Sequence, residues 1–329
     1  MRFGQLFAAS AVLLLGGTNA HGQNAIQRQD VEFSNDTLRL AGTLYLPQRA
    51  ANLPAVVLIH GSGETDRTSL RYYAEMFAQN GVVALVYDKR GVGKSQGAKL
   101  AWRNFSLTDL AADAAAGARF LRTRPEVDST RIGLFGASQG GWVAPLAAQL
   151  LGNARFVITV SASLTTIAED NVFERAARLR REGFAPADVA AARAMHEQDI
   201  ALSRTGASFT EFERTWQANK GAPWFRRVYL DSSPAPADHR YRVWYRTVMD
   251  FDPVPVWRAI AAPALFIFGD TSLDDSSPVE RSLALAGALK AGGRDIDVIS
   301  LPGANHSLQR GGKDVTIAAQ LMAWLKPRL

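Results

Sequence analysis

The feature that most constrains this chain is the alternation of short, wholly apolar runs with longer amphipathic stretches. The apolar runs occupy residues 55–59, 82–87 and 132–135, and residues 156–160 are predicted to form a further strand. Stretches of helical periodicity lie between them, at residues 69–79 and 107–122. A run that is apolar at every position is typical of a strand buried on both faces. The alternation therefore predicts an α/β fold, with a mostly parallel sheet and helices on both faces.

The pattern changes on either side of this region. Residues 31–33 and 38–46 alternate polar and apolar side chains, which predicts an antiparallel hairpin at the sheet edge. Residues 164–257 lack a convincing strand and contain helix-like stretches, so we expect a helical insertion there. Strands resume at 264–268 and 296–301, and helices at 278–290 and 315–324. The core would then comprise residues 26–163 and 258–329.

Composition excludes several classes of function. Hydrophobic residues make up 47% of the chain and charged residues 21%, as in an ordinary globular protein. The net charge is +6, but Lys and Arg are interleaved with Asp and Glu, so we expect no nucleic-acid partner. The absence of cysteine excludes disulfides, metal–thiolate sites and a cysteine nucleophile.

The N-terminus has the pattern of a secretory signal peptide. Arg2 supplies a positive charge, residues 6–15 form an apolar run, and the small-residue site at 18–20 precedes His21. The apolar run is too short to span a membrane, and without cysteine there is no lipoprotein anchor. We therefore predict a signal peptide at residues 1–20, cleaved near Ala20, a periplasmic or secreted protein, and no stable membrane anchor.

Residues 136–140 carry the strongest chemical signal, the pentapeptide Gly-Ala-Ser-Gln-Gly. The preceding apolar run and the following helical stretch would place Ser138 in a tight turn between a strand and a helix, which exposes its hydroxyl. Side chains at Gly136 or Gly140 would collide with neighbouring backbone at so sharp a bend. Ser138 is thus a candidate nucleophile.

Four ordered motifs resemble the α/β-hydrolase superfamily, and most closely its bacterial esterase and S9–S33 peptidase-like branch. They are His60-Gly61-Ser62-Gly63, the stretch 87–95 beginning Tyr-Asp-Lys-Arg-Gly, the pentapeptide with Gly141 and Trp142, and Pro302-Gly303-Ala304-Asn305-His306. The resemblance extends from about residue 31 to the C-terminus, apart from a weakly matching middle. It implies that residues 164–257 form a helical cap.

The resemblance also implies the partners of Ser138. A serine needs a base, and His306 follows the last strand, where the superfamily places its base. The acid should lie between serine and histidine, in the loop after residue 268. Counting back from Pro278 favours Asp274, with Asp275 and then Asp270 as alternatives. The two unused carboxylates would cap the helix that starts near Pro278.

The tetrahedral oxyanion needs two N–H donors, which we assign to the backbone of Gln139 and of Ser62. Asp88, Arg90, Gly91 and Gly93 are interpreted as scaffold around the site. Aromatic residues of the insertion either wall an acyl pocket or pack the cap onto the core: Trp216, Trp224, Phe225, Tyr229, Tyr241, Trp244 and Tyr245. We find no acidic cluster beside them in the sequence, and so no support for a pocket that recognises an amine.

These features predict a secreted serine hydrolase of the carboxylesterase type, acting through an acyl-enzyme without cofactor or metal. Its partner would be a small-molecule ester, and its oligomeric state is open. A serine peptidase, aminopeptidase-like and with the same triad, is the alternative. A non-catalytic binding protein on this fold is a third interpretation, against which intact Ser138 and His306 argue.

Overall fold

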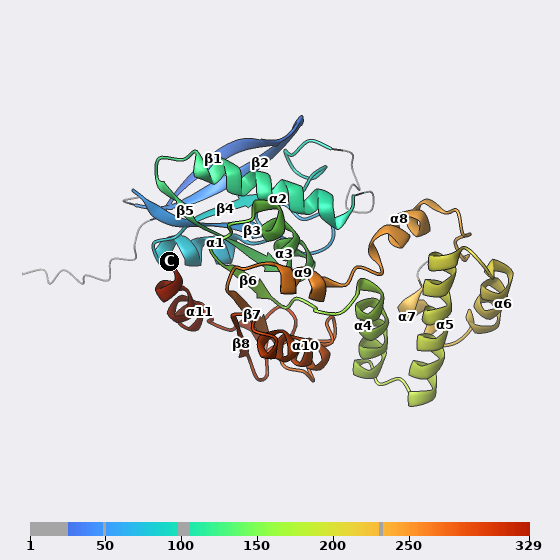
Figure 1. The fold of residues 1–329 in the computed structure, drawn as a ribbon. Coiled ribbons are helices and arrows are strands. Elements are labelled where there is room, and N and C mark those ends of the chain that lie inside the picture. Colours follow the sequence, from blue (N-terminus) through green and yellow to red (C-terminus); the bar gives the residue numbers. More distant parts are fainter. Residues whose placement is uncertain (1–25, 49–50, 98–104, 230–232) are drawn as a thin grey trace, which may run out of the picture.

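A central sheet organises the chain in the computed structural model, which describes residues 26–48, 51–97, 105–229 and 233–329 (Figure 1). The predicted signal peptide, residues 1–20, lies outside the described residues. Among the helices that are described, none is both long and apolar enough to cross a membrane.

The sheet has eight strands in the order β1-β2-β4-β3-β5-β6-β7-β8. The hairpin of β1 (Ile26–Asn35) and β2 (Leu38–Pro47) forms one edge, antiparallel to its neighbour β4. All other pairings are parallel. Their strands are β3 (Leu53–Ile59), β4 (Val83–Tyr87), β5 (Val127–Ala137), β6 (Val157–Val160), β7 (Ala264–Phe268) and β8 (Ile296–Ser300). The predicted mostly parallel sheet and its edge hairpin are confirmed.

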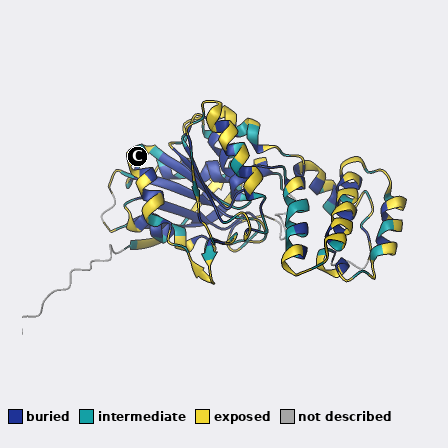
Figure 2. Ribbon diagram, turned by 90° about the horizontal axis from the view of Figure 1, so that it is seen from below, coloured by how far each residue is buried: buried dark blue, intermediate teal, exposed yellow. Residues whose placement is uncertain are grey.

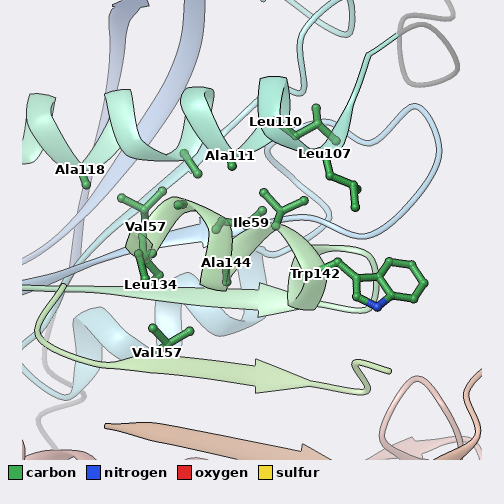
Figure 3. Close-up of a cluster of buried hydrophobic side chains, with 14 of the residues drawn as sticks. Val57, Ile59, Leu107, Leu110, Ala111, Ala118, Leu134, Trp142, Ala144 and Val157 are labelled. Atoms are coloured by element: carbon green, nitrogen blue, oxygen red, sulfur yellow. The ribbon is translucent and has the colours of Figure 1, made fainter. Parts of the chain in front are cut away.

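Helices cover both faces of this sheet, because successive strand residues point to opposite sides. Val57 and Ile59 pack against the helices α2 (Leu107–Arg122) and α3 (Gly140–Leu151), as Figure 3 shows. On the same side lie α9 (Pro253–Ala259) and α10 (Val279–Ala291). Val56 and Leu58 instead meet α1 (Arg71–Gln79) and α11 (Ala318–Leu325). The strands are thus buried on both faces, as their composition predicts.

Local chemistry explains where individual helices begin. Ser106 accepts a hydrogen bond from the Asp109 backbone, and the Asp109 carboxylate accepts one in return from the Ser106 N–H, so α2 begins at Leu107. The last helix begins at residue 318, later than the predicted 315. The Val315 N–H instead donates to the Leu308 carbonyl, beside the small hairpin of β9 (Gln309–Arg310) and β10 (Lys313–Asp314).

Residues 164–257 place most of their helices to one side of the core (Figure 1). These are α4 (Ile167–Arg181), α5 (Pro186–Thr205), α6 (Phe209–Asn219), α7 (Phe225–Val228) and α8 (Arg240–Val248). Helices α4–α7 enclose an apolar cluster of their own, which includes Leu179, Met195 and Phe212, whereas Tyr245 and Val248 of α8 belong to the core cluster. Much of their remaining surface is exposed, in contrast to the buried sheet (Figure 2). We call α4–α8 the cap.

Helix α9 packs directly on the sheet. Trp257 is buried in the core cluster, with its ring centroid 4.7 Å from that of Phe266 in β7. The sequence pattern predicts that the core resumes at residue 258. In the structure the chain is already packed on the sheet at Trp257.

Candidate active site

Ser138 occupies a strained turn between β5 and α3. Its φ angle is 50°, in the left-handed region that non-glycine residues rarely adopt. A Cβ on Gly136 would lie 2.2 Å from the Gly140 carbonyl oxygen, and one on Gly140 would lie 2.3 Å from the Ile59 oxygen. The predicted steric need for both glycines is confirmed. Strain held in this way by the surrounding backbone presents the serine hydroxyl at the carboxyl end of β5.

Three side chains from distant parts of the sequence meet at this turn. The His306 Nε2 lies 3.2 Å from the Ser138 Oγ, within hydrogen-bond reach. The His306 Nδ1 lies 2.9 Å from Oδ1 of Asp274 and 3.2 Å from its Oδ2. The Asp274 side chain is fully buried, and its Oδ1 also accepts backbone N–H groups from Ser276 and Ser277. A carboxylate held in this way fixes the orientation of the imidazole.

The other two candidate acids serve different contacts. The Asp270 carboxylate accepts hydrogen bonds from the backbone N–H groups of Ser272 and Gly303, at 2.9 and 2.8 Å. The Asp275 carboxylate pairs with Arg181 of α4. Helix α10 follows Pro278 without any side-chain cap. The prediction that the unused acids cap this helix is therefore wrong: each instead ties the acid loop to another segment.

The electrostatics of His306 suit a base. Burial disfavours the imidazolium and by itself lowers the His306 pKa, but the hydrogen bond and charge of Asp274 more than offset this. The negative charges of Asp170 and Glu174 on α4 act in the same direction. The net result is a pKa above the ordinary 6.5, because the charged imidazolium faces carboxylates.

The glycine loop after β3 lies directly against the nucleophile. A Cβ built on Gly61 would come within 3.4 Å of the Ser138 Cβ. Ser62 and Gln139 both line the cavity onto which Ser138 and His306 open. Gln139 precedes α3, and the first N–H groups of a helix lack partners within it. Both predicted donor residues thus lie at the cavity that contains the serine.

The cavity above the serine has a volume of about 790 Å³. Five of the seven aromatic residues singled out in the insertion line it, namely Trp216, Tyr229, Tyr241, Trp244 and Tyr245. Trp224 and Phe225 pack instead inside the cap. The two interpretations overlap, because Tyr245 lines the cavity and also belongs to the core cluster, while Trp216 and Tyr229 line it and belong to the cap cluster.

Carboxylates also line this cavity, contrary to expectation. Asp170 and Glu174, one helical turn apart on α4, are among its lining residues, as is Asp199 of α5. The Asp199 Oδ1 forms an ion pair with Arg242 at 2.6 Å, whereas the buried Oδ1 of Asp170 has neither a hydrogen-bond nor an ion-pair partner among the described residues. Burial raises the Asp170 pKa to about 7. The i, i+4 spacing of the first two residues was the signal that sequence reasoning missed.

The loop after β4 is braced by buried ion pairs. Asp88 accepts hydrogen bonds from the Arg67 guanidinium at 2.8 and 3.0 Å, and Arg90 donates to Asp113 at 2.6 and 2.7 Å. Asp88 and Arg90 do not line the described cavity, which fits their interpretation as scaffold. The residue between them, Lys89, was not singled out, although it directly follows a strand that ends beside the site.

Comparison with known families identifies the family of this chain. The model of the alpha/beta hydrolase family matches residues 56–318. The chain belongs to the alpha/beta hydrolase family. This alpha/beta hydrolase is 28% identical over 270 residues to thiohydrolase aneE of Aspergillus aculeatus, covering 79% of this chain and 81% of the relative. It is 36% identical over 140 residues to a thiohydrolase of Eupenicillium brefeldianum, covering 42% and 44% of the two chains.

Solved structures share the fold of this alpha/beta hydrolase. An esterase from Pyrococcus furiosus aligns over 92% of this chain and 91% of its own, with a TM-score of 0.57 at 18% identity. The family and its relatives identify the chain as a hydrolase.

Proposed function

We propose that this hydrolase is an exported serine enzyme that cleaves carboxylic esters through an acyl-enzyme intermediate. The proposal rests on one observation. Two consecutive side-chain hydrogen bonds link Ser138 to His306 and His306 to Asp274, at a strained turn that opens on a cavity. A nucleophile, its base and an orienting carboxylate within this reach form the arrangement required for acyl transfer.

Each step uses groups of this chain and water. The Ser138 Oγ attacks the substrate carbonyl while the His306 Nε2 takes its proton. Asp274 holds the Nδ1–H and stabilises the imidazolium that forms. The backbone N–H groups of Ser62 and Gln139 donate to the oxyanion, after which His306 protonates the departing alcohol. Water, activated by His306, then releases the acyl group from Ser138.

The cavity limits the substrate class. A volume of about 790 Å³ walled by aromatic side chains fits a small-molecule ester with an apolar or aromatic acyl group. Two relatives are thiohydrolases, so acyl thioesters belong in the substrate panel beside oxygen esters. The same Ser138 chemistry serves both, because each substrate presents a carbonyl with a leaving group.

Ser138→Ala tests the proposal directly. The variant is expected to lose hydrolysis of short p-nitrophenyl esters and acyl thioesters, and also covalent labelling by a fluorophosphonate probe. Ser129→Ala, at an exposed serine on β5, is the matched control and should retain both. Activity that survives in the Ser138 variant would contradict the assignment. Export rests on residues 1–20, and N-terminal sequencing of periplasmic protein should find cleavage near Ala20.

A second candidate, a serine peptidase that acts beside a free amine, is favoured by one observation. The buried Oδ1 of Asp170 has no partner among the described residues, and Glu174 lies one turn away on the same cavity wall. A substrate ammonium bound beside this wall would face both carboxylates and be stabilised by their negative charge. Aminoacyl p-nitroanilides with a free amine, compared with their N-acetylated forms and with acyl esters, separate the two candidates. Preference for free-amine anilides would favour the peptidase.

A further inference from the structure

A lysine lies almost completely buried beside the candidate site, with 1% of its surface exposed. Lys89 follows β4, and none of the ion pairs found among the described residues includes it. Its neighbours pair elsewhere, Asp88 with Arg67 and Arg90 with Asp113. A buried ammonium without a carboxylate is costly, and burial lowers the Lys89 pKa to about 7. Such a group calls for an explanation beyond packing.

Three oxygen atoms surround its nitrogen. The Lys89 Nζ donates to the carbonyl of Gly61 at 2.6 Å and to the carbonyl of Gly63 at 3.1 Å. Its third bond goes to the side-chain Oε1 of Gln139, at 3.1 Å. An ammonium has three N–H donors and no acceptor, so these partners use all of its hydrogen-bonding capacity. The lysine therefore connects the glycine loop to the residue that follows Ser138.

The bond to Gly61 constrains a neighbouring amide. The Gly61 carbonyl and the Ser62 N–H belong to one planar peptide unit, and the described chain contains no cis peptide. In a trans unit the N–H points away from the C=O. Holding the Gly61 oxygen toward Lys89 therefore aims the Ser62 N–H in the opposite direction. The bond to Gly63 fixes the loop on the other side of Ser62.

We propose that Lys89 is a positioning residue for the oxyanion hole, which sets the direction of the Ser62 donor and fixes it relative to the Gln139 donor. This inference rests on the proposed function of the site. It adds that efficient ester hydrolysis requires the hydrogen bonds of Lys89. Lys89 acts through backbone carbonyls and one side-chain amide. Its loss should therefore weaken binding of the tetrahedral transition state and leave binding of the planar ester nearly unchanged.

Lys89→Met tests this requirement, because methionine keeps the length of the side chain and removes its donors. We expect kcat on an acyl ester to fall about 10- to 100-fold, less than the loss of a whole oxyanion donor, with KM within about threefold of the wild type. Affinity for a trifluoromethyl ketone, which forms a tetrahedral adduct, should fall in parallel. Lys94→Met, at an exposed lysine of the same loop, is the control and should change neither quantity.

The outcomes separate this inference from the proposed function. If the wild type hydrolyses no ester or thioester, the proposed function fails. If the wild type is active and a folded Lys89→Met variant retains its kcat, or loses activity through KM alone, the inference fails and the function stands. Should Lys89→Met not fold, Gln139→Met decides, because it removes one of the three bonds from the opposite end. Unchanged kcat and ketone affinity in that variant would overturn the inference.

Discussion

Asp274→Asn is the perturbation that tests the catalytic assignment most sharply. Asparagine keeps the size of the side chain but removes the charge that faces the His306 imidazole. Its amide oxygen would remain with the backbone N–H groups of Ser276 and Ser277, which now hold Oδ1 at 3.1 and 3.0 Å. The NH2 group would then occupy the Oδ2 position, 3.2 Å from the His306 Nδ1. The retained amide oxygen, 2.9 Å from Nδ1, can still accept the Nδ1–H, so the main change is the loss of the negative charge.

The magnitude follows from the geometry. With the two charge centres about 4 Å apart and an effective dielectric constant of about 20, the carboxylate stabilises the imidazolium by about 4 kcal/mol. Loss of this stabilisation corresponds to about a 10³-fold lower kcat. A comparable Asp to Asn change in a serine protease costs about 10⁴-fold. We therefore expect a decrease of 10³- to 10⁴-fold.

The assay is steady-state hydrolysis of an acyl ester, with thermal unfolding followed in parallel. Asp275→Asn is a matched control one residue away. Its partner Arg181 is largely exposed, and pairs of that kind contribute about 1 kcal/mol or less. Its kcat should stay within about threefold of the wild type. Retention of more than a tenth of wild-type kcat by Asp274→Asn, or an equal loss in Asp275→Asn, would refute the reasoning.

Two further predictions concern pH and stability. The base works only when neutral, and the His306 pKa is raised above 6.5, so kcat/KM should fall on acidification with a midpoint above 6.5. Glu174→Gln removes one charge that raises this pKa and should move the midpoint to lower pH; an unmoved or higher midpoint would contradict the coupling. Gly140→Ala should destabilise the fold by about 1–3 kcal/mol in urea unfolding, because its Cβ would meet the Ile59 carbonyl at 2.3 Å. Gly287→Ala, in open space on α10, should stabilise it by up to about 1 kcal/mol, and equal signs for the two would contradict the steric argument.

The sheet could be predicted from sequence because its signals are local. Runs such as 55–59 and 264–268 are apolar throughout. Helix α2 starts at a capping box that is formed by Ser106 and Asp109, within four consecutive residues. The positions of Ser138 and His306 could be predicted for a related reason. Ser138 directly follows β5, and His306 lies in the turn after β8, which ends at Ser300, so once the sheet is known, both lie at its carboxyl edge.

The remaining features of the site depend on contacts between distant segments. Three aspartates in one loop differ little in sequence, and only the folded loop shows that Asp274 faces His306, while Asp275 faces Arg181. The acidic wall of the cavity was missed because α4 reaches it only through the placement of the cap. Lys89 was missed because its three partners come from residues 61, 63 and 139.

Charged groups close to Ser138 differ in how far the protein itself satisfies them. Asp274 has the His306 imidazole and two backbone N–H groups, and Lys89 has three oxygen acceptors. Asp170 keeps one buried oxygen without a partner among the described residues, and burial raises its pKa to about 7. Buried polar atoms are ordinarily hydrogen-bonded, because leaving one unpaired costs about 1–3 kcal/mol. On the proposed function, Asp274 and Lys89 are charged groups that the fold holds in fixed positions, whereas Asp170 is a group whose protonation would respond to the charge of a bound substrate.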